Sequence, residues 1–452
     1  MASLAFARAV LLRHFGYADF RPAQLPVIQS ILAGHDVLAV LPTGGGKSVC
    51  FQVPAVALGG LTVVVTPLVA LMDDQVAAAS ARGIAAGALH AGMPDRARAA
   101  VLLAVQQRTL SLLYASPERL SSLARRLRAL AGTPTLLAVD EAHCISEWGH
   151  DFRPSYRALR RVRWLLGEPQ TLALTGSATP DVRQDIAASL ALGTRFGATP
   201  RGLDTHVSSF DRANLHFGVV RVRDEPDRLA RLLALLSGSR GLSMVYVPTR
   251  GLAERVAGRL RGLGWRTAAY HAGLSAERRS ILLREFLADR HEVIVATCAF
   301  GMGIDKPDVR LVVHWTIPAT PESYYQEAGR AGRDGQPSRC IALWHPRDLD
   351  VHRRQLAVTF PPPPLCASVW GDPQLAQGLP KGVVASIERL RAELRPDLGR
   401  VNWASVRDRR RTAQHRLRAM RAYVTGRECR RKRLLAWFGE SGVPCRSCDR
   451  CR

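Results

Sequence analysis

A glycine-rich stretch near the N-terminus, LPTGGGKS at residues 41–48, has the residue types that bind phosphate groups. Glycines allow backbone N–H groups to wrap phosphate oxygens, while Lys47 can reach the β- and γ-phosphates and Ser48 can hold Mg²⁺. Leu41 stands where the strict phosphate-loop pattern has glycine, so the stretch fits the variant T-G-x-G-K-S. A glycine turn that merely follows a strand is the alternative. We predict a nucleotide site formed by Thr43, Gly44, Gly45, Gly46, Lys47 and Ser48.

Lys47 is one of only four lysines among 63 basic residues, the others being 306, 381 and 432. The abundance of arginine, alanine, glycine and proline indicates a compositional bias, so a lysine can mark a position that arginine cannot serve. A compact ammonium group fits among phosphate oxygens where a planar guanidinium would not. The scarcity of lysine therefore supports the nucleotide site.

Two acidic residues, Asp140 and Glu141, end the apolar stretch TLLAV at 135–139. In a site that cleaves phosphate, one such carboxylate holds Mg²⁺ and the other orients the attacking water, because the reaction depends on positioning and neutralised charge. Acidic pairs at strand ends are also common as solvated residues, so this signal depends on the glycine-rich stretch. Together they predict ATP hydrolysis, with Lys47, Asp140 and Glu141 as catalytic residues and with Ser48 and Asp140 as Mg²⁺ ligands.

Two arginines later in the chain, Arg330 and Arg333, lie in QEAGRAGRDG at residues 326–335. Their spacing of three residues would place them on one face of a helix. We predict that they act as arginine fingers, which stabilise the charge that develops on a transferred phosphate. Ordinary surface salt bridges are the alternative.

Nine cysteines are distributed unevenly, and four of them crowd the C-terminus. Cys429 is followed by fifteen residues and then by C-x2-C-x2-C at Cys445, Cys448 and Cys451. Four thiolates suit tetrahedral Zn²⁺, and a full set of protein ligands indicates a structural ion. Disulfide bonds are the alternative, but the other five cysteines show no pairing pattern and fit a reducing compartment.

The chain of 452 residues has a formal charge of +25, which indicates a polyanionic partner such as nucleic acid, although the arginine bias accounts for part of it. Residues 405–452 hold 15 basic and 4 acidic residues, a net charge of +11, so this segment is expected to hold duplex phosphates. A solvated basic helix is the alternative. No apolar run of about 18 residues occurs, and the N-terminus lacks a cleavage site, so a cytoplasmic protein is expected.

Short apolar runs alternate with helical stretches over most of the chain. Their apolar character predicts parallel sheets covered on both faces, and two series of runs predict two α/β domains divided near residues 205–225. The expected strands are 36–42, 61–67, 110–117, 135–141 and 171–179 in the first series and 242–250, 267–273, 291–300, 309–315 and 338–345 in the second.

The ordered set of motifs resembles the RecQ family of DNA helicases over residues 15–350 and again over 415–452. The motifs are FGYADFRPAQ, PTGGGKS, TPLVALMDDQV, YASPERL, DEAHCISEWGHDFRPSY, LTGSATP, FGMGIDKPDVR and QEAGRAGRDG. CRRKRLLAWFGES resembles the family's zinc-binding helix, whose packing face would be Leu434, Leu435 and Phe438. Asp73 and Glu147 stand where the family often has lysine and glutamine, which puts negative charge near the expected DNA track.

The resemblance implies two RecA-like P-loop domains with parallel sheets, at 1–207 and 208–350, and a small, mostly helical zinc-binding module at 405–452. It implies a monomeric, nucleoid-associated bacterial enzyme that uses ATP, Mg²⁺ and Zn²⁺ to unwind DNA from 3′ to 5′ in DNA repair and recombination. Single-stranded and tailed duplex DNA would be its substrates. A duplex translocase or annealing factor that separates no strands is the alternative, and a catalytically inactive nucleic-acid-binding scaffold is a weaker one.

The resemblance also implies further nucleotide contacts. Tyr17, Arg21 and Gln24 of the opening motif would hold the adenine. Asp305 and Gln326, in the motifs of the second domain, would also contact the nucleotide.

The segment after the acidic pair corresponds to an aromatic-rich loop that touches single-stranded DNA in the family. Trp148 and Phe152 are four residues apart, so a helical turn would present both rings on one side. A base stacked on such a ring gains roughly 1–3 kcal/mol. We predict that Trp148, Phe152 and Arg153 bind DNA, with His143 and Arg153 as relays to the other domain. A tryptophan packed in the core is the alternative.

Residues 351–404 match no family motif. The stretch KGVVASIERLRAEL has a helical apolar stripe that Pro396 and Gly399 end, which predicts a small helical or winged-helix-like subdomain. Phe360, Trp370 and Trp403 would offer rings for stacking on an end base pair. A variable connecting loop is the alternative. The sequence ends one residue after Cys451, so a short form without the family's C-terminal winged-helix and helical domains is expected.

Overall fold

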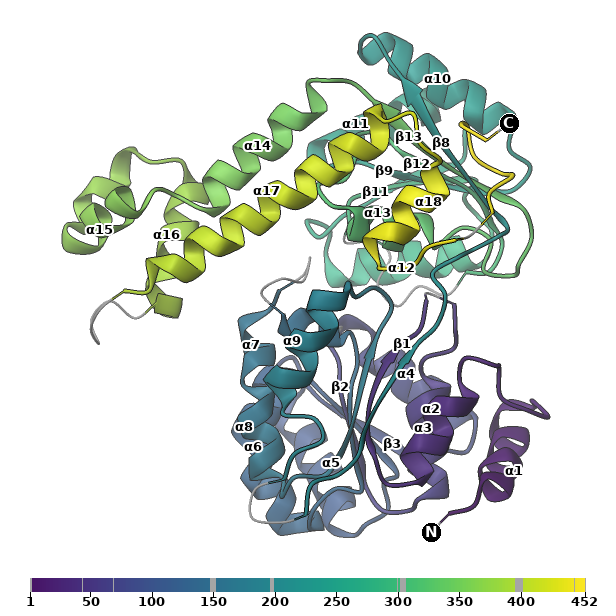
Figure 1. Ribbon diagram of the computed structural model, residues 1–452, viewed down its shortest axis with the longest axis vertical. Helices are drawn as coiled ribbons and strands as arrows, with labels where there is room; N and C mark the ends of the chain where they lie inside the picture. Colours follow the sequence, from purple (N-terminus) through teal and green to yellow (C-terminus); the bar gives the residue numbers. More distant parts are fainter. Residues whose placement is uncertain are drawn as a thin grey trace. The chain divides into compact units, whose positions relative to one another are not determined.

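The computed structural model describes residues 2–42, 44–67, 69–146, 152–195, 199–298, 300, 306–394, 401–442 and 444–451. The chain divides into two compact units. The first comprises residues 1–212, 301–307 and 435–441, and the second comprises 213–300, 308–434 and 442–452. Each unit is built around its own parallel sheet (Figure 1).

The first unit contains a seven-stranded sheet with strand order β3-β4-β2-β5-β6-β1-β7, in which every pairing is parallel. The strands are β1 (Asp36–Val40), β2 (Thr62–Val65), β3 (Ala86–Leu89), β4 (Leu112–Ala115), β5 (Leu136–Val139), β6 (Gln170–Thr175) and β7 (Leu203–Val207). The helices are α1 (Leu4–Phe15), α2 (Leu25–Leu32), α3 (Val49–Ala57), α4 (Val69–Ala81), α5 (Asp95–Gln106), α6 (Pro117–Ala131), α7 (Pro154–Arg157), α8 (Leu159–Leu165) and α9 (Pro180–Leu190), with the 3₁₀ turn η1 (Ala142–Ile145).

Helices cover both faces of this sheet. On one face, alternate strand residues such as Val37 and Leu172 join Ile31 of α2 and Phe51 of α3 in one hydrophobic cluster. Helices α6, α8 and α9 cover the opposite face (Figure 1). Because both faces are buried, the central strands are apolar throughout, which is the pattern that made them recognisable in the sequence.

The second unit contains a six-stranded parallel sheet with strand order β10-β11-β9-β12-β13-β8. The strands are β8 (Leu215–Arg221), β9 (Leu242–Tyr246), β10 (Thr267–Tyr270), β11 (Val293–Ala296), β12 (Val309–His314) and β13 (Ser338–Trp344). Helices α10 (Glu225–Ser237) and α11 (Arg250–Gly262) cover one face, and α12 (Ala276–Leu287) and α13 (Pro321–Ala328) cover the other (Figure 1). The predicted fold, two parallel α/β sheets, is therefore confirmed.

All ten expected strands are present, but three strands were not expected. β3, β7 and β8 are all at the edges of their sheets. β7 has the sequence LDTHV and is half-exposed along its length, so it lacks the continuous apolar run of a central strand. β3 is AGAL, and β8 carries a histidine and a glycine within its first residues. Edge strands are covered on fewer sides and need fewer apolar residues, so a search for continuous apolar runs misses these three strands.

Residues 348–394 and 401–425 form helices that extend from the second unit's sheet (Figure 1). They are α14 (Asp348–Thr359), α15 (Pro363–Gly371), the 3₁₀ turn η2 (Pro373–Gly378), α16 (Lys381–Leu394) and α17 (Trp403–Thr425). Cys366, Ile387, Leu390 and Val406 are buried at the centre of a small hydrophobic cluster. The described part of this segment contains helices and no strand, so it has a helical rather than a winged-helix form.

The three aromatic rings expected to offer stacking surfaces in this segment pack against its hydrophobic cluster. Phe360, Trp370 and Trp403 are partly buried against the cluster. The two indoles stack on each other with centroids 5.3 Å apart and planes at 9°. Nε1 of Trp370 donates to the carbonyl of Ile387 at 3.2 Å. So small a helical unit uses its largest rings to complete its own core, and stacking of these partly buried rings on a base pair stays a prediction.

Candidate ATP site and zinc centre

The glycine-rich loop lies between β1 and α3, at the carboxyl end of the parallel strands, where such sheets bind their ligands. Gly44 and Gly46 have φ angles of 84° and 72°, in the left-handed region that favours glycine. A Cβ atom on Gly46 would lie 2.5 Å from Nε2 of Gln24, so a larger residue would displace this amide from the loop. Ser48 directly precedes α3, and helix N-termini bind phosphates through free N–H groups and the helix dipole. Thr43 lies outside the described residues.

Two residues expected near the adenine contact the backbone of this loop. Nη1 of Arg21 donates to the carbonyl of Gly44 at 2.6 Å. Nε2 of the buried Gln24 donates to the carbonyls of Gly45 and Gly46 at 3.2 and 3.0 Å. Tyr17 remains 56% exposed. The segment predicted to bind the base is thus hydrogen-bonded to the segment predicted to bind the phosphates.

The acidic pair follows β5 at the same edge of the sheet. Burial, and next the Glu141 carboxylate, raise the pKa of Asp140 to about 7, whereas the nearby Lys47 lowers it. A divalent cation would favour the ionised carboxylate, so this arrangement suits a metal ligand. Glu141 has φ and ψ of 47°, a left-handed backbone that is uncommon outside glycine and that is typical of functional sites. The structure therefore brings Lys47, Asp140 and Glu141 together, as the sequence predicted.

Thr175 and Tyr156 contact the segment of the acidic pair, and neither was singled out from the sequence. Nδ1 of the buried His143 lies 3.0 Å from Oγ1 of Thr175 and 3.3 Å from Oε2 of Glu141. The hydroxyl of Tyr156 donates to the carbonyl of Asp140 at 3.1 Å. Thr175 belongs to LTGSATP and Tyr156 to the DEAH-containing motif, so the motifs contained the signal but gave neither residue a role.

The predicted DNA loop is only partly described. Trp148 lies outside the described residues, as does Glu147. Phe152 is partly buried, precedes α7 rather than lying in it, and has the guanidinium of Arg157 5.7 Å from its ring centroid. Nη1 of Arg153 donates to the carbonyl of Pro67 at 3.1 Å, within the first unit. DNA contact by these residues stays a prediction.

Arg330 and Arg333 belong to the second unit. They were expected on one face of a helix, but α13 ends at Ala328 and turns follow, so neither arginine lies in this helix. Gly332 and Gly335 have φ angles of 54° and 81°, which are incompatible with a continued α-helix. Arg330 is buried, and its charge lowers the pKa of Tyr246, which burial raises more strongly.

Two further residues of the second motif series, Asp305 and Gln326, were predicted to contact the nucleotide. Gln326 lies within α13 and is partly buried. Asp305 lies outside the described residues. Nucleotide contact by either residue stays a prediction.

The four C-terminal cysteines form a zinc site. The sulfur atoms of Cys429, Cys445, Cys448 and Cys451 all lie within 4.8 Å of one another, and those of Cys429 and Cys448 are 3.9 Å apart. Tetrahedral Zn²⁺ with Zn–S distances of about 2.3 Å requires sulfurs about 3.8 Å apart, so the thiols fit this ion. Structural zinc organises the folding of small modules.

The zinc loop is attached to the edge strand of the second unit's sheet. Cys448 forms a parallel β-bridge with Phe217 of β8, and the N–H of Asp449 donates to the carbonyl of Phe217 at 3.1 Å. The Asp449 carboxylate accepts from the N–H of Val219 at 3.1 Å and from Nε of the buried Arg430 at 2.9 Å. The loop thus pairs with the edge of the sheet, where a strand would otherwise leave backbone groups without partners.

The zinc helix α18 (Arg430–Trp437) has the packing face that the sequence predicted. Leu434, Leu435 and Phe438 are all buried. Phe438 belongs to the first unit, where its ring stacks on Phe210 with centroids 4.4 Å apart and planes at 10°. In the same unit, Glu440 accepts from the N–H of Phe210 at 2.7 Å.

Comparisons with known protein families agree with the geometry. Residues 21–186 match a DEAD/DEAH box helicase model, residues 225–335 match a helicase conserved C-terminal domain, and residues 387–452 match a RecQ zinc-binding domain. A relative from Bacillus subtilis, described as probable ATP-dependent DNA helicase RecS, is 41% identical over 347 residues, which cover 76% of this chain and 68% of the relative. The chain belongs to the RecQ family.

Other relatives of this RecQ chain are longer than it is. ATP-dependent DNA helicase RecQ of Haemophilus influenzae is 34% identical over 446 residues, which cover 98% of this chain and 63% of that protein. RecQ of Bacillus subtilis is 41% identical over 350 residues, which cover 77% of this chain and 57% of that protein. The aligned part of the RecQ chain therefore spans less than two thirds of these two relatives.

Solved structures share the fold of the RecQ chain at low sequence identity. Mycobacterium smegmatis helicase Lhr, bound to single-stranded DNA and AMP-PNP, gives a TM-score of 0.59 at 21% identity, covering 93% of this chain and 57% of that chain. The DUF1998 helicase MrfA, bound to DNA, gives a TM-score of 0.62 at 17% identity, covering 77% of this chain and 50% of that chain. Within the described part of the RecQ chain, no helix is both long enough and apolar enough to cross a membrane.

Proposed function

We propose that this RecQ chain is an ATP-driven motor that moves from 3′ to 5′ along single-stranded DNA and separates the strands of a duplex. The observation that carries the proposal is the arrangement around β5. The acidic pair that follows this strand lies near Lys47, and His143, two residues further on, lies beside both Glu141 and Thr175. Hydrolytic residues and the start of the predicted DNA loop are thus parts of one continuous segment.

Hydrolysis is assigned to residues of the glycine-rich loop and the acidic pair. Lys47 holds the β- and γ-phosphates, Ser48 and Asp140 hold Mg²⁺, and Glu141 orients the attacking water. When bound, Mg²⁺ supplies the positive charge that neutralises the phosphate oxygens. Arg330 and Arg333 supply further positive charge to the γ-phosphate. Tyr17, Arg21 and Gln24 hold the adenine, with Asp305 and Gln326 as further nucleotide contacts.

Coupling to DNA is assigned to the loop that follows η1. Trp148 and Phe152 stack on bases, and Arg153 contacts the strand. Because Arg153 is hydrogen-bonded to Pro67 and its N–H donates to the carbonyl of Cys144 at 2.9 Å, movement of the loop reaches the segment of the acidic pair. DNA binding would thereby change the position of Glu141 and accelerate hydrolysis.

The zinc module and its basic helix are assigned to duplex DNA. Helix α17 carries exposed arginines at 407, 410, 411, 418 and 421, spread along one long helix. Such a row suits the regularly spaced phosphates of a duplex. Similarity to bacterial RecQ proteins supports a cytoplasmic role in DNA repair and recombination, with tailed duplexes as substrates.

The test combines two measurements on the same preparation. ATP hydrolysis is measured with and without single-stranded DNA, and strand separation is measured on 3′-tailed and 5′-tailed duplexes. Stimulated hydrolysis with separation of the 3′-tailed duplex alone is expected. Stimulated hydrolysis without separation of either duplex would instead identify a translocase or annealing factor. A rate of hydrolysis that DNA does not change would refute a DNA motor.

A further inference from the structure

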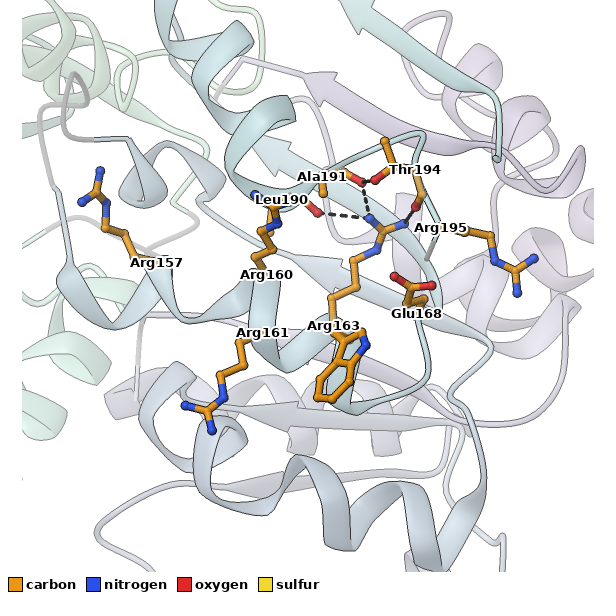
Figure 2. A pocket seen from close by; sticks show the side chains of 10 residues that line it. Arg157, Arg160, Arg161, Arg163, Glu168, Leu190, Ala191, Thr194 and Arg195 are labelled. Carbon is orange, nitrogen blue, oxygen red and sulfur yellow. Dashed lines mark hydrogen bonds between the residues drawn. The ribbon is translucent and has the colours of Figure 1, made fainter. Parts of the chain in front are cut away.

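A cavity of about 700 Å³ lies in the first unit, between α8 and the turn that follows α9 (Figure 2). Its volume is within the usual range of ligand sites, and none of its residues belongs to the predicted ATP site. It is lined by Arg157, Arg160, Arg161, Arg163, Trp164, Glu168, Leu190, Ala191, Thr194 and Arg195.

One wall of the cavity is fixed by a buried arginine. The guanidinium of Arg163 donates to the carbonyls of Leu190 at 3.1 Å and Thr194 at 3.2 Å, and also to that of Ala191 (Figure 2). Its Nη2 is 2.6 Å from the buried carboxylate of Asp36. Arg163 is therefore neutralised and structural, and it holds the turn after α9 against α8.

The remaining charge in the cavity is strongly positive. Besides Arg163, four arginines and a single glutamate line it. Arg160 and Arg161 are exposed on α8, and Arg157 precedes them by about one helical turn. Residues three or four apart on a helix are separated by about 4.5–6 Å along its axis. The cavity thus carries three arginines within five residues, at the end of α7 and the start of α8.

An exposed indole lies beside these charges. Trp164 is 54% exposed, so its ring is not part of the core of the unit. A second hollow of about 280 Å³, between α6 and α8, shares Arg161 with the first and adds Arg125. The basic surface therefore continues from one hollow into the next.

The turn after α9, which forms one wall of the cavity, lies at the opposite end of the sheet from the glycine-rich loop. Glu168 precedes the first residue of β6, and the N–H of Gly193 donates to Asp36, the first residue of β1, at 2.9 Å. The glycine-rich loop follows the last residue of the same β1 strand. A ligand in the cavity would therefore leave the ATP site open.

We propose that this cavity binds a short segment of single-stranded nucleic acid, as a strand site in addition to the one predicted at Trp148 and Phe152. A basic groove combined with an aromatic ring is the usual means of holding single strands without sequence preference, because phosphates meet the arginines and bases stack on the ring. The proposal rests on the proposed function in one respect, namely that the polyanion bound in the cavity is DNA. An acidic peptide would meet the same charges, and the experiment separates the two.

The experiment uses the full chain and photocrosslinks an oligothymidylate that contains 5-iododeoxyuridine. The expected result is an adduct on the peptide that contains Trp164, mapped by mass spectrometry. The variant Arg160→Ala/Arg161→Ala should reduce this adduct about tenfold at subsaturating DNA, the change that ~1.4 kcal/mol produces. A matched control, Arg13→Ala/Arg96→Ala, removes two exposed arginines from other helices of the same unit and should leave the adduct unchanged.

Salt dependence of adduct formation at Trp164 gives a second readout. For single strands, log K falls with log[salt] by about 0.7 per phosphate contact, so the double variant should lower the slope by about 1.4 and the control should not. Thermal unfolding checks that both variants are folded. An absent adduct in the wild-type chain, or an adduct that the double variant retains, overturns the proposal.

Two further measurements distinguish a nucleic acid from an acidic protein and the cavity from the motor. A polyglutamate peptide that binds the wild-type chain but not the double variant, while the oligonucleotide gives no adduct, would assign the cavity to an acidic protein and overturn the proposal. ATP hydrolysis by the wild-type chain, with and without DNA, reports on the proposed function separately. Stimulated hydrolysis without the adduct would defeat the second strand site alone.

Discussion

His143 lies 3.0 Å from Thr175 through its Nδ1 atom, and this contact joins the ends of two neighbouring strands. The same nitrogen is 3.3 Å from Glu141, the proposed water-orienting carboxylate. Oγ1 of Thr175 also accepts from the N–H of Ser177 at 3.3 Å. A single threonine hydroxyl therefore holds the histidine that positions the carboxylate.

Replacing this hydroxyl should slow hydrolysis without preventing nucleotide binding. We expect Thr175→Val to lower kcat for ATP about tenfold, because hydrogen bonds to charged groups are worth about 1.5–3 kcal/mol and about 1.4 kcal/mol is tenfold in rate. The measurement is steady-state ATPase together with the Kd of a nucleotide analogue. Thr171→Val is the matched control, since it removes a buried hydroxyl from the other end of β6. An equal loss in both variants would show a general packing defect.

Lys47→Arg should abolish ATP hydrolysis although it keeps the positive charge. A planar guanidinium cannot occupy the compact position between phosphate oxygens and the acidic pair. Turnover is measured at saturating ATP. Lys381→Arg, at an exposed lysine of the helical segment, is the control and should hydrolyse ATP normally. Near-normal turnover in Lys47→Arg would overturn the nucleotide-site assignment.

Trp148→Ala should erase the stimulation of ATP hydrolysis by single-stranded DNA, since the proposed sensor loses its stacking ring. Hydrolysis is measured across a range of DNA concentrations and compared with hydrolysis without DNA. Phe6→Ala, which removes an exposed aromatic ring from α1 of the same unit, is the comparison and should still be stimulated. If stimulation survives in Trp148→Ala, the loop is structural.

Purified protein should contain about one Zn²⁺ per chain, and chelation should unfold the C-terminal module, because metal binding there contributes folding energy. Metal analysis and proteolysis check this. Cys448→Ser should lose the ion, whereas Cys298→Ser, which changes an exposed cysteine outside the cluster, should retain it. Metal-free protein that binds DNA tightly would contradict the zinc site.

Deleting residues 362–402, with a short linker in their place, should spare DNA-stimulated ATPase but greatly reduce unwinding. The deletion removes α15, η2 and α16, while α14 and α17 remain. Trp370, the aromatic ring of the removed part, packs against the segment's own hydrophobic cluster, so the contribution of this part to strand separation would come from its surface. Unwinding of a 3′-tailed duplex is the measurement, with stimulated hydrolysis as the internal control. A deletion that unwinds like the full chain would make the segment a connector.

The zinc ligands and the candidate ATP residues could be identified in the sequence because both depend on local patterns. A phosphate loop needs glycines, a lysine and a serine in immediate succession, and Cys445, Cys448 and Cys451 are close neighbours in the chain. The central strands were equally plain, because strands buried on both faces must be apolar throughout.

Tertiary structure decided the contacts between distant segments and the use of rings. His143 and Thr175 meet because β5 and β6 are adjacent in the sheet, and no local pattern pairs them. Trp370 and Trp403 stack on each other in a core, although their sequence context equally suited exposed rings. The arginine-lined cavity exists because Arg163 fixes the turn after α9. Sequence periodicity defines which face of an element is apolar, but only packing determines what that face meets, since many partners satisfy the same pattern.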